Sequence, residues 1–245
     1  MKNYKMILQY DGTRYDGWQK QGNTANTIQQ KLETLLSDLV KHSVEVFGSG
    51  RTDMGVHAYG QVANARLLWN KSEEELLLAI NDRLPEDIAV LHVEEVPLRF
   101  HSRLNARSKR YCYRIWNSRR PPVFERKTVF WCKEALDVEK MKEAASCFLG
   151  SHDFKNFSSA KGKKSTVRTI YNIDILQQGE EIQISFHGDG FLYHMVRILT
   201  GTLIEVGEGK RTIESIAKVF QEGTRQDAGF TAPAKGLALM EVFYE

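Results

Sequence analysis

The order of predicted strands and helices constrains the fold of this chain most strongly. In the first hundred residues, segments with the alternating pattern of strands flank two segments that open with helix-capping residues. Strands are predicted over 4–10, 44–47, 62–67 and 88–96, and helices over 27–40 and 72–84. Thr27 and Ser72 each begin a segment with the spacing of a capping box. The resulting order, β-α-β-β-α-β, is compatible with a ferredoxin-like or RRM-like unit.

The second half of the chain repeats the same kinds of element without a visible sequence repeat. Strands are predicted over 111–116, 168–176, 181–186 and 236–244, and the middle two form a hairpin. Helices are predicted over 137–150, within 190–206, and over 212–220. We therefore expect an α+β protein with two ferredoxin-like or RRM-like units. The predicted domains are residues 1–100 and 101–245.

Positive charge is concentrated in two segments. Residues 101–128 hold nine basic residues and one acid, and residues 155–168 hold five basic residues and no acid. The whole chain has a net charge of +3, so the remaining 203 residues carry −10. Basic segments on an otherwise acidic protein indicate a polyanionic partner, although a solvated basic face is the simpler alternative. Tyr111, Tyr113 and Trp116 lie among the arginines, which suits stacking on unpaired bases.

The composition excludes several other classes of protein. The longest apolar run covers only residues 76–80, whereas a membrane-spanning helix needs about 20 residues. The N-terminal residues lack the apolar stretch of a secretory signal. Three scattered cysteines do not match a disulfide framework or a zinc site. We expect a cytoplasmic protein.

The segment 48–58, GSGRTDMGVHA, holds the densest group of unusual residues. Its three glycines permit tight turns and close approach of a ligand. It lacks the last glycine of a dinucleotide-binding motif and the lysine of a Walker loop. Asp53 lies in this segment, between Arg51 and His57. Its carboxylate has the chemistry of a nucleophile, a general base or a metal ligand, and equally of a cap for the next turn. His57 is open to a catalytic or a packing role.

These residues make the chain resemble a known family. GSGRTDMGVHA resembles the active-site motif of the tRNA pseudouridine synthase A family, and other segments resemble further motifs of that family in the same order. Those segments are YDGT at 10–13, GWQ at 17–19, NDRLPEDI at 81–88, FHSR at 100–103, KRYCY at 109–113, GSHDF at 150–154 and FLYHMVR at 191–197. Ser102 departs from the alanine usual in the family.

The resemblance implies an enzyme that isomerises uridine to pseudouridine in the anticodon arm of tRNA, around positions 38 to 40, without a metal or organic cofactor. It implies a homodimer whose two domains form a mixed, mainly antiparallel sheet, flanked by helices, with a central basic cleft. Asp53 matches the catalytic acid, which acts on a flipped-out uridine. Arg197 matches the arginine that pairs with this acid, and Tyr111 matches the active-site tyrosine.

The remaining substrate contacts follow from the same resemblance and from the basic segments. We expect Arg51 to occupy the gap left by the extruded uridine, or else to bind a phosphate. Arg103, Arg110 and His57 are the other expected substrate contacts, with Tyr111 stacking on the target base. The basic segments then contact the RNA backbone and read its shape.

Two other classes of function compete with this interpretation. A non-catalytic RNA-binding protein explains the basic and aromatic segments but has no use for Asp53 with Arg51. A metal-dependent phosphodiesterase would use Asp53, His57 and His101, and would lose activity with a chelator. No candidate ligand lies at a diagnostic spacing for a metal.

Overall fold

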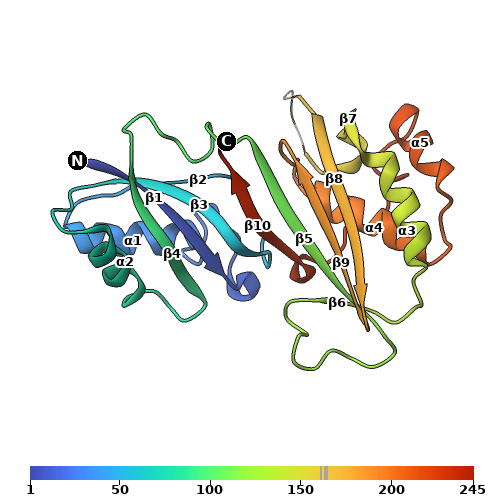
Figure 1. The fold of residues 1–245 in the computed structure, drawn as a ribbon, viewed down its shortest axis with the longest axis horizontal. Coiled ribbons are helices and arrows are strands. Elements are labelled where there is room, and N and C mark those ends of the chain that lie inside the picture. The colour runs from blue at the N-terminus through green and yellow to red at the C-terminus, as the bar shows by residue number, and fades with distance from the viewer. Residues whose placement is uncertain (161, 163–164) are drawn as a thin grey trace. The chain divides into compact units, whose positions relative to one another are not determined.

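The chain forms an α+β protein with two compact units (Figure 1). The first unit contains residues 1–107 together with 238–245, and the second contains 108–237. The structure, a computed structural model, describes residues 1–160, 162 and 165–245. Three lysines of the second basic segment, Lys161, Lys163 and Lys164, lie outside the described residues. The division into domains 1–100 and 101–245 stays a prediction.

The first unit is built on a mixed sheet in the order β4-β1-β3-β10. Strand β1 (Lys2–Tyr10) pairs antiparallel with β3 (His57–Leu67) and with β4 (Ile88–Val96). A short strand, β2 (Val46–Gly48), pairs antiparallel with β3. The last strand, β10 (Leu237–Phe243), runs parallel to the start of β3. The element order of the first half is therefore the predicted β-α-β-β-α-β.

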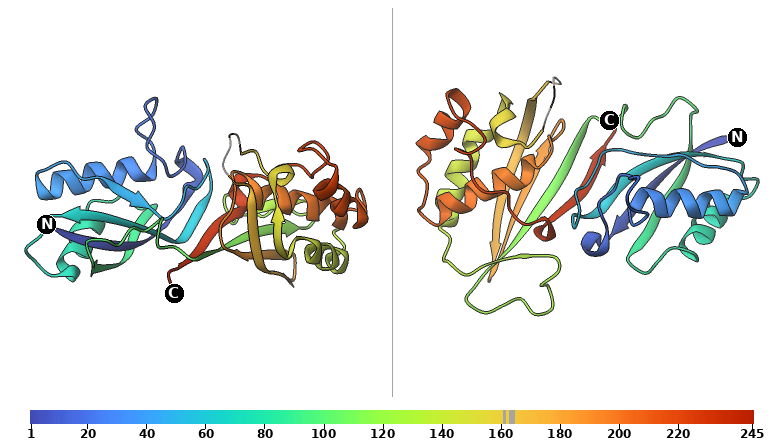
Figure 2. Two further views of the ribbon diagram at one scale, coloured as in Figure 1. Left: turned by 90° about the horizontal axis from the view of Figure 1, so that it is seen from above. Right: turned by 180° about the vertical axis from the view of Figure 1, so that it is seen from behind.

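Two helices accompany this sheet, and their N-termini follow the predicted capping residues. Helix α1 (Ile28–Val40) starts after Thr27, whose side chain accepts a hydrogen bond from a backbone N–H of the first turn. Helix α2 (Glu73–Asn81) starts after Ser72, where both bonds of a capping box with Glu75 are present. Figure 2, in the view from behind, shows α1 crossing one face of the strands. Its apolar residues at helical spacing are buried there.

The strands of the second unit have the order β5-β9-β8-β7. Strands β5 (Ser108–Asn117), β9 (Glu181–Gly188), β8 (Val167–Gln178) and β7 (Gly150–Asp153) pair antiparallel with their neighbours. The predicted hairpin is β8 and β9. Strand β6 (Phe130–Cys132) pairs parallel with β5. The two units thus combine a mainly antiparallel pattern with two parallel pairings.

The helices of the second unit are α3 (Val138–Ala145), α4 (Met195–Gly207) and α5 (Glu214–Gln221). Helix α3 starts after the predicted cap, Asp137, but it ends five residues before Gly150. It ends early because a 3-10 turn follows and Gly150, with φ +92°, opens strand β7. Helices α3 and α4 contact each other. Most of α4 is buried, as its apolar composition requires.

Several elements differ from the predictions. Strand β3 begins at His57, five residues before the predicted start, and α2 ends at Asn81 instead of Leu84. Strands β6 and β7 were not predicted. The short 3-10 turns are η1 (Gly12–Arg14), η2 (Ser146–Phe148), η3 (Lys155–Phe157) and η4 (Ala234–Gly236). In the described part of the chain, no helix has the length and hydropathy needed to cross a membrane.

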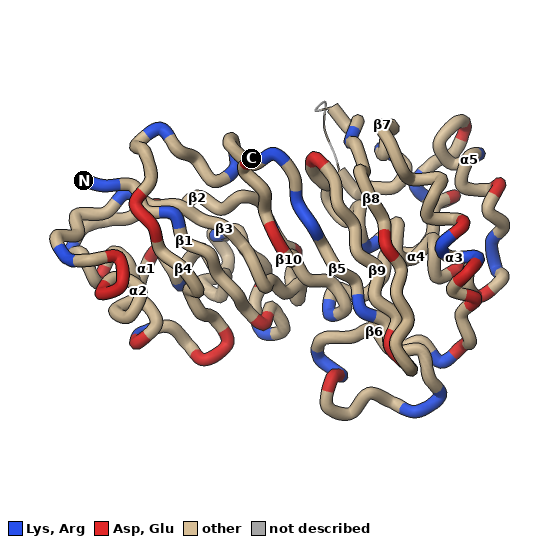
Figure 3. Tube along the Cα trace, viewed as in Figure 1, with Lys and Arg blue, Asp and Glu red and all other residues tan. Residues whose placement is uncertain are grey.

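Charged residues lie in clusters along the chain. Figure 3 shows Lys and Arg in succession where β5 begins, while acids mark α2 and the end of β4. Two arginines of the first basic segment pair with glutamates of the second unit. Arg114 donates to Glu181 through Nε and Nη2, at 2.7 and 2.9 Å, and Arg120 binds Glu180 at 2.8 Å. The pairing with Arg114 is the main reason that the pKa of Glu181 is lowered. Arg114 therefore helps to hold β5 against β9, whereas Arg120 is 83% exposed and its ion pair adds little stability.

Candidate active site

Asp53 lies in the connection between β2 and β3, in a loop that covers residues 49–56. The loop starts with a hydrogen bond from the Ser49 N–H to the Val62 carbonyl, at 2.7 Å. It ends with a turn in which the Val56 N–H donates to the Asp53 carbonyl, at 3.1 Å. Gly55 has φ +77°, a conformation that favours glycine. We call residues 49–56 the Asp53 loop.

The segment that follows β1 packs directly against the Asp53 loop. A side chain at Gly12 would place its Cβ 2.0 Å from the Val56 carbonyl oxygen. Gly17, with φ +91°, would place one 2.7 Å from the Thr52 carbonyl oxygen. The Trp18 N–H donates to that same Thr52 oxygen, at 3.0 Å. These close backbone contacts explain why the chain has glycines at 12 and 17.

A buried group of polar side chains holds the loop from its other side. The Tyr10 hydroxyl shares a hydrogen bond of 2.8 Å with the Thr52 hydroxyl. Gln61 donates to the Gly50 carbonyl at 3.2 Å and to the Tyr10 oxygen at 3.4 Å, and it accepts from the Ser49 hydroxyl at 2.7 Å. Burial raises the pKa of Tyr10 to about 12, so the phenol stays protonated at neutral pH. The backbone on both sides of Arg51 is thus fixed.

The predicted site residues of the first unit have different degrees of exposure. Asp53 is partly exposed and Arg51 is exposed. His57 is only 5% exposed, and its Nδ1 accepts a hydrogen bond of 3.1 Å from the Gly12 N–H. The same nitrogen lies 3.1 Å from a carboxylate oxygen of Asp11. These contacts give His57 a part in holding the segment after β1, and substrate contact by His57 stays a prediction.

Arg51 has a defined partner in the segment after β1. Its Nε donates to the Oε1 of Gln19 at 3.0 Å, although the two residues are 32 positions apart in the sequence. Sequence reasoning did not find Gln19, Tyr10 or Gln61 as parts of this site. The motifs at 10–13 and 17–19 mark the segment, but they do not indicate which of its side chains contact the Asp53 loop.

The predicted site residues of the second unit lie on β5 and α4. Tyr111 is 8% exposed, and its ring meets Phe191 edge-on with centroids 5.2 Å apart. Arg110 precedes it on β5 and is exposed. Arg197 lies in the first turn of α4, where its Nε donates to the Ala232 carbonyl at 2.7 Å. The Ala232 N–H donates in turn to the Arg197 carbonyl at 3.1 Å, so this side chain is fixed from both ends.

The remaining predicted contact, Arg103, lies in the first unit after β4 and is exposed. The first unit thus holds Asp53, Arg51, His57 and Arg103, and the second holds Tyr111, Arg110 and Arg197. Among the residues that the structure describes, no three His, Cys, Asp or Glu side chains gather as potential metal ligands.

Comparisons with known proteins address the family of the chain. A family model described as "tRNA pseudouridine synthase" matches residues 6–105 and 144–245. The tRNA pseudouridine synthase A 2 of Clostridium perfringens is 47% identical over 245 residues, covering all of both chains. The tRNA pseudouridine synthase A of a Bacillus strain, KSM-64, is 49% identical over 240 residues and 98% of both chains.

Solved structures give a much weaker match. A chain in a crystal structure of a Cbf5–Nop10–Gar1 complex aligns with 97% of this chain and 48% of its own, at 12% identity and a TM-score of 0.38. A similarity at this level adds nothing to the assignment. The sequence matches, which span the chain from end to end, establish that it belongs to the tRNA pseudouridine synthase A family of RNA-modifying isomerases.

Proposed function

We propose that this enzyme converts uridine to pseudouridine in the anticodon stem-loop of tRNA, around positions 38, 39 and 40. The N1–C1′ bond of the uridine breaks, the base turns, and a C5–C1′ bond forms. C5 loses its proton and N1 gains one, so atoms and electrons balance without an oxidant or reductant. The resemblance to the family, together with the fixed backbone of the Asp53 loop, supports this substrate and this reaction.

In this proposal, Asp53 is the catalytic nucleophile. Glycine contacts and buried hydrogen bonds fix the backbone around Asp53, while the residue itself is partly exposed. This combination is what a nucleophile needs: a set position with access for the substrate. A carboxylate can begin the reaction in three ways: by adding to C6 of the uracil, by attacking C1′, or by removing a sugar proton.

Arg197 and Tyr111 have supporting roles in the proposal. Arg197 supplies a cation for the Asp53 carboxylate, since a guanidinium stays charged and binds carboxylates in a defined geometry. Tyr111 supplies a ring for the target uracil and a hydroxyl for proton transfer.

The target uridine is stacked in a stem or loop, so it must be extruded before the reaction. Arg51 is the side chain that we propose for the vacated space, because it is exposed and lies two residues from Asp53. Arg103, Arg110 and the exposed basic residues bind phosphates, which fixes the position of the RNA but not its sequence.

The proposal includes a homodimer in the cytoplasm. The three cysteines are free, and burial raises the pKa of Cys112 and of Cys132 to about 11. Protonated thiols of this kind are stable in a reducing compartment. Light scattering of the purified protein, with and without tRNA, tests the dimer.

Site mapping tests the proposed substrate. Three tRNA transcripts, each with uridine at only one of positions 38, 39 and 40, are incubated with the enzyme, and pseudouridine is located by carbodiimide labelling and primer extension. A fourth transcript with cytidine at all three positions is the control. We expect modification in the first three and none in the control. Modification of the control at another position would refute the anticodon-arm assignment while leaving the isomerase activity in place.

A further inference from the structure

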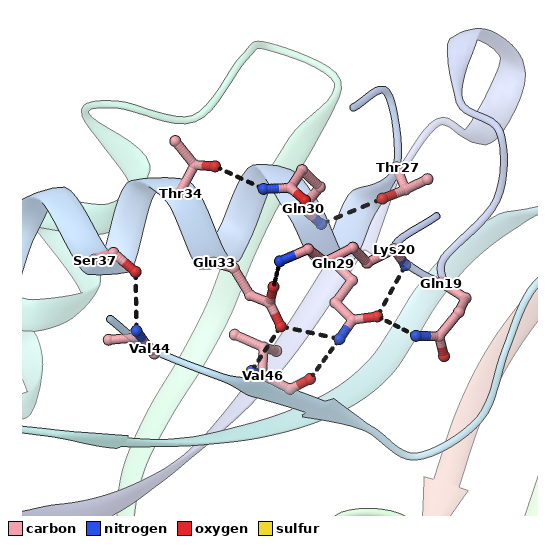
Figure 4. Close-up of polar contacts among 10 residues, drawn as sticks. All are labelled: Gln19, Lys20, Thr27, Gln29, Gln30, Glu33, Thr34, Ser37, Val44 and Val46. Carbon is pink, nitrogen blue, oxygen red and sulfur yellow. Dashed lines mark hydrogen bonds and ion pairs between the residues drawn. The ribbon is translucent and has the colours of Figure 1, made fainter. Parts of the chain in front are cut away.

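Two polar side chains lie on the buried face of α1. Gln29 is 9% exposed and Glu33 is 7% exposed, on a helix face whose other buried residues include Ile28, Leu32 and Leu36. Polar groups in such a position destabilise a protein unless each is hydrogen-bonded. Figure 4 shows how this requirement is met and which residues take part.

Every hydrogen-bonding position of the Gln29 amide is filled. Its Nε2 donates to Glu33 Oε1 and to the Val46 carbonyl, both at 3.0 Å. Its Oε1 accepts from Gln19 Nε2 at 2.8 Å and from the Lys20 N–H at 3.0 Å. A rotation of this amide by 180° would place donors against donors and an oxygen against acceptors. The orientation of Gln29 is therefore determined.

Glu33, which accepts a hydrogen bond from Gln29, is itself held in place by further contacts. Its Oε1 also accepts from the Val46 N–H at 3.1 Å, and its Oε2 receives the Lys20 ammonium at 3.1 Å. The carboxylate thus connects α1, strand β2 and the segment after β1. Because β2 leads into the Asp53 loop, the Glu33 carboxylate also connects the start of that loop to α1.

The orientation of Gln29 dictates that of Gln19. Since Gln29 presents an oxygen, Gln19 must point its amide nitrogen toward it, and its Oε1 then points the other way. That oxygen accepts the hydrogen bond from Arg51 Nε, at 3.0 Å. A series of hydrogen bonds therefore runs from the buried Glu33 to the exposed Arg51. Reversing the side-chain amide of Gln19 or of Gln29 would break two of the contacts in this series.

We infer that Gln19, Gln29 and Glu33 are positioning residues that hold Arg51 ready for base extrusion. A long exposed side chain otherwise samples many rotamers, and ordering it would slow the step that needs it. The bond at Nε fixes the plane of the guanidinium before RNA binds. This inference rests on the role that the proposed function gives Arg51.

We call the series of contacts Glu33–Gln29–Gln19–Arg51 the relay. Gln19→Met is the variant that tests it. It keeps the length of the side chain but removes both amide contacts, and it avoids the core, where changing Gln29 would endanger folding. The matched control is Gln30→Met, because Gln30 lies on α1 beside Gln29 and its side chain donates to Thr34 at the surface, outside this group of contacts. Arg51→Met and the double variant Gln19→Met/Arg51→Met complete the cycle.

Extrusion is measured by stopped-flow fluorescence, with 2-aminopurine placed next to the target uridine in a tRNA transcript. We expect Gln19→Met to slow the fluorescence rise and the single-turnover rate by about 10-fold to 100-fold. Its tRNA Kd should change less than about threefold, and its Tm should match that of Gln30→Met, which should behave like the wild type. In the Arg51→Met background, Gln19→Met should have no further effect.

The outcomes separate the relay from the role of Arg51. If Arg51→Met slows extrusion and Gln19→Met does not, the relay is wrong and the role of Arg51 stands. If the two effects multiply in the double variant, Gln19 acts independently of Arg51 and the relay is equally wrong. If Arg51→Met itself leaves extrusion unchanged, the proposed role of Arg51 fails, and the relay fails with it.

Discussion

Tyr10→Phe removes one oxygen atom from beneath the Asp53 loop. The Tyr10 hydroxyl is buried and shares its 2.8 Å hydrogen bond with Thr52, the residue before Asp53. The substitution leaves the Thr52 hydroxyl with one partner fewer in dry surroundings. Such a loss costs about 2 kcal/mol of unfolding free energy. In a chain of this length, that lowers the Tm by about 4–8 °C.

The same variant has a distinct dependence on pH. Burial raises the pKa of Tyr10 to about 12, from an ordinary value of 10.0. Below pH 10 the phenol is neutral in the folded and unfolded states, so it contributes its full stability there. Above pH 10 the unfolded chain ionises first, and this stability is lost as the pH rises through 12. Two pKa units correspond to about 2.7 kcal/mol, about half of which is lost by pH 11.

Urea denaturation of both proteins at pH 8 and pH 11 measures this effect. Cys112 and Cys132 also titrate in this range, but they are common to both proteins and cancel in the difference. We expect the advantage of the wild type over Tyr10→Phe to shrink by about 1.4 kcal/mol between the two pH values. An unchanged difference would refute the argument that the Tyr10 hydroxyl is held in a dry site under the loop.

Three further variants test other parts of the site. Gly17→Ala should lower the unfolding free energy by about 1–3 kcal/mol, because φ is +91° and the Cβ would lie 2.7 Å from the Thr52 oxygen; urea denaturation that matches the wild type would contradict this. Arg197→Lys should reduce the single-turnover rate by about 10-fold or more while tRNA affinity stays within about threefold, since an ammonium cannot reproduce the fork of a guanidinium; filter binding and single-turnover assays separate the two quantities. Arg110→Ala should weaken binding to all tRNAs alike and make the slope of log K against log salt shallower by about 1; an unchanged slope would exclude a phosphate contact.

The elements that the sequence predicted best are those with local signals. Ser72 and Glu75 form the capping box expected from their spacing, and the β8–β9 hairpin follows alternation around a turn. Strand β3 begins at His57, five residues before its predicted start, and Gly60 lies within the part that was missed. In the structure, Gly60 lies within β3 where β10 approaches, and a Cβ there would be 2.3 Å from the Met240 carbonyl oxygen.

Other features depend on pairing between distant segments, which no local pattern records. The three residues of β6 form a strand only because Ile115 pairs with Phe130. The glycines at 48, 50 and 55 led to the prediction of a site at Asp53, which stays a prediction. The contact between Gln19 and Arg51 joins segments 32 residues apart and has no local signal. Arg114 was counted among the basic residues expected to bind RNA. In the structure it donates two hydrogen bonds to Glu181 on the neighbouring strand.

The central claim, that Asp53 initiates isomerisation of uridine in tRNA, is tested most directly by tritium release. The substrate is tRNA carrying 5-tritiated uridine, and the enzymes are the wild type, Asp53→Asn and the control Asp38→Asn, whose side chain is exposed on α1. Rejoining through C5 expels the tritium. We predict release by the wild type and by Asp38→Asn, and none by Asp53→Asn with tRNA binding intact. Release by Asp53→Asn at the rate of the wild type would contradict the account.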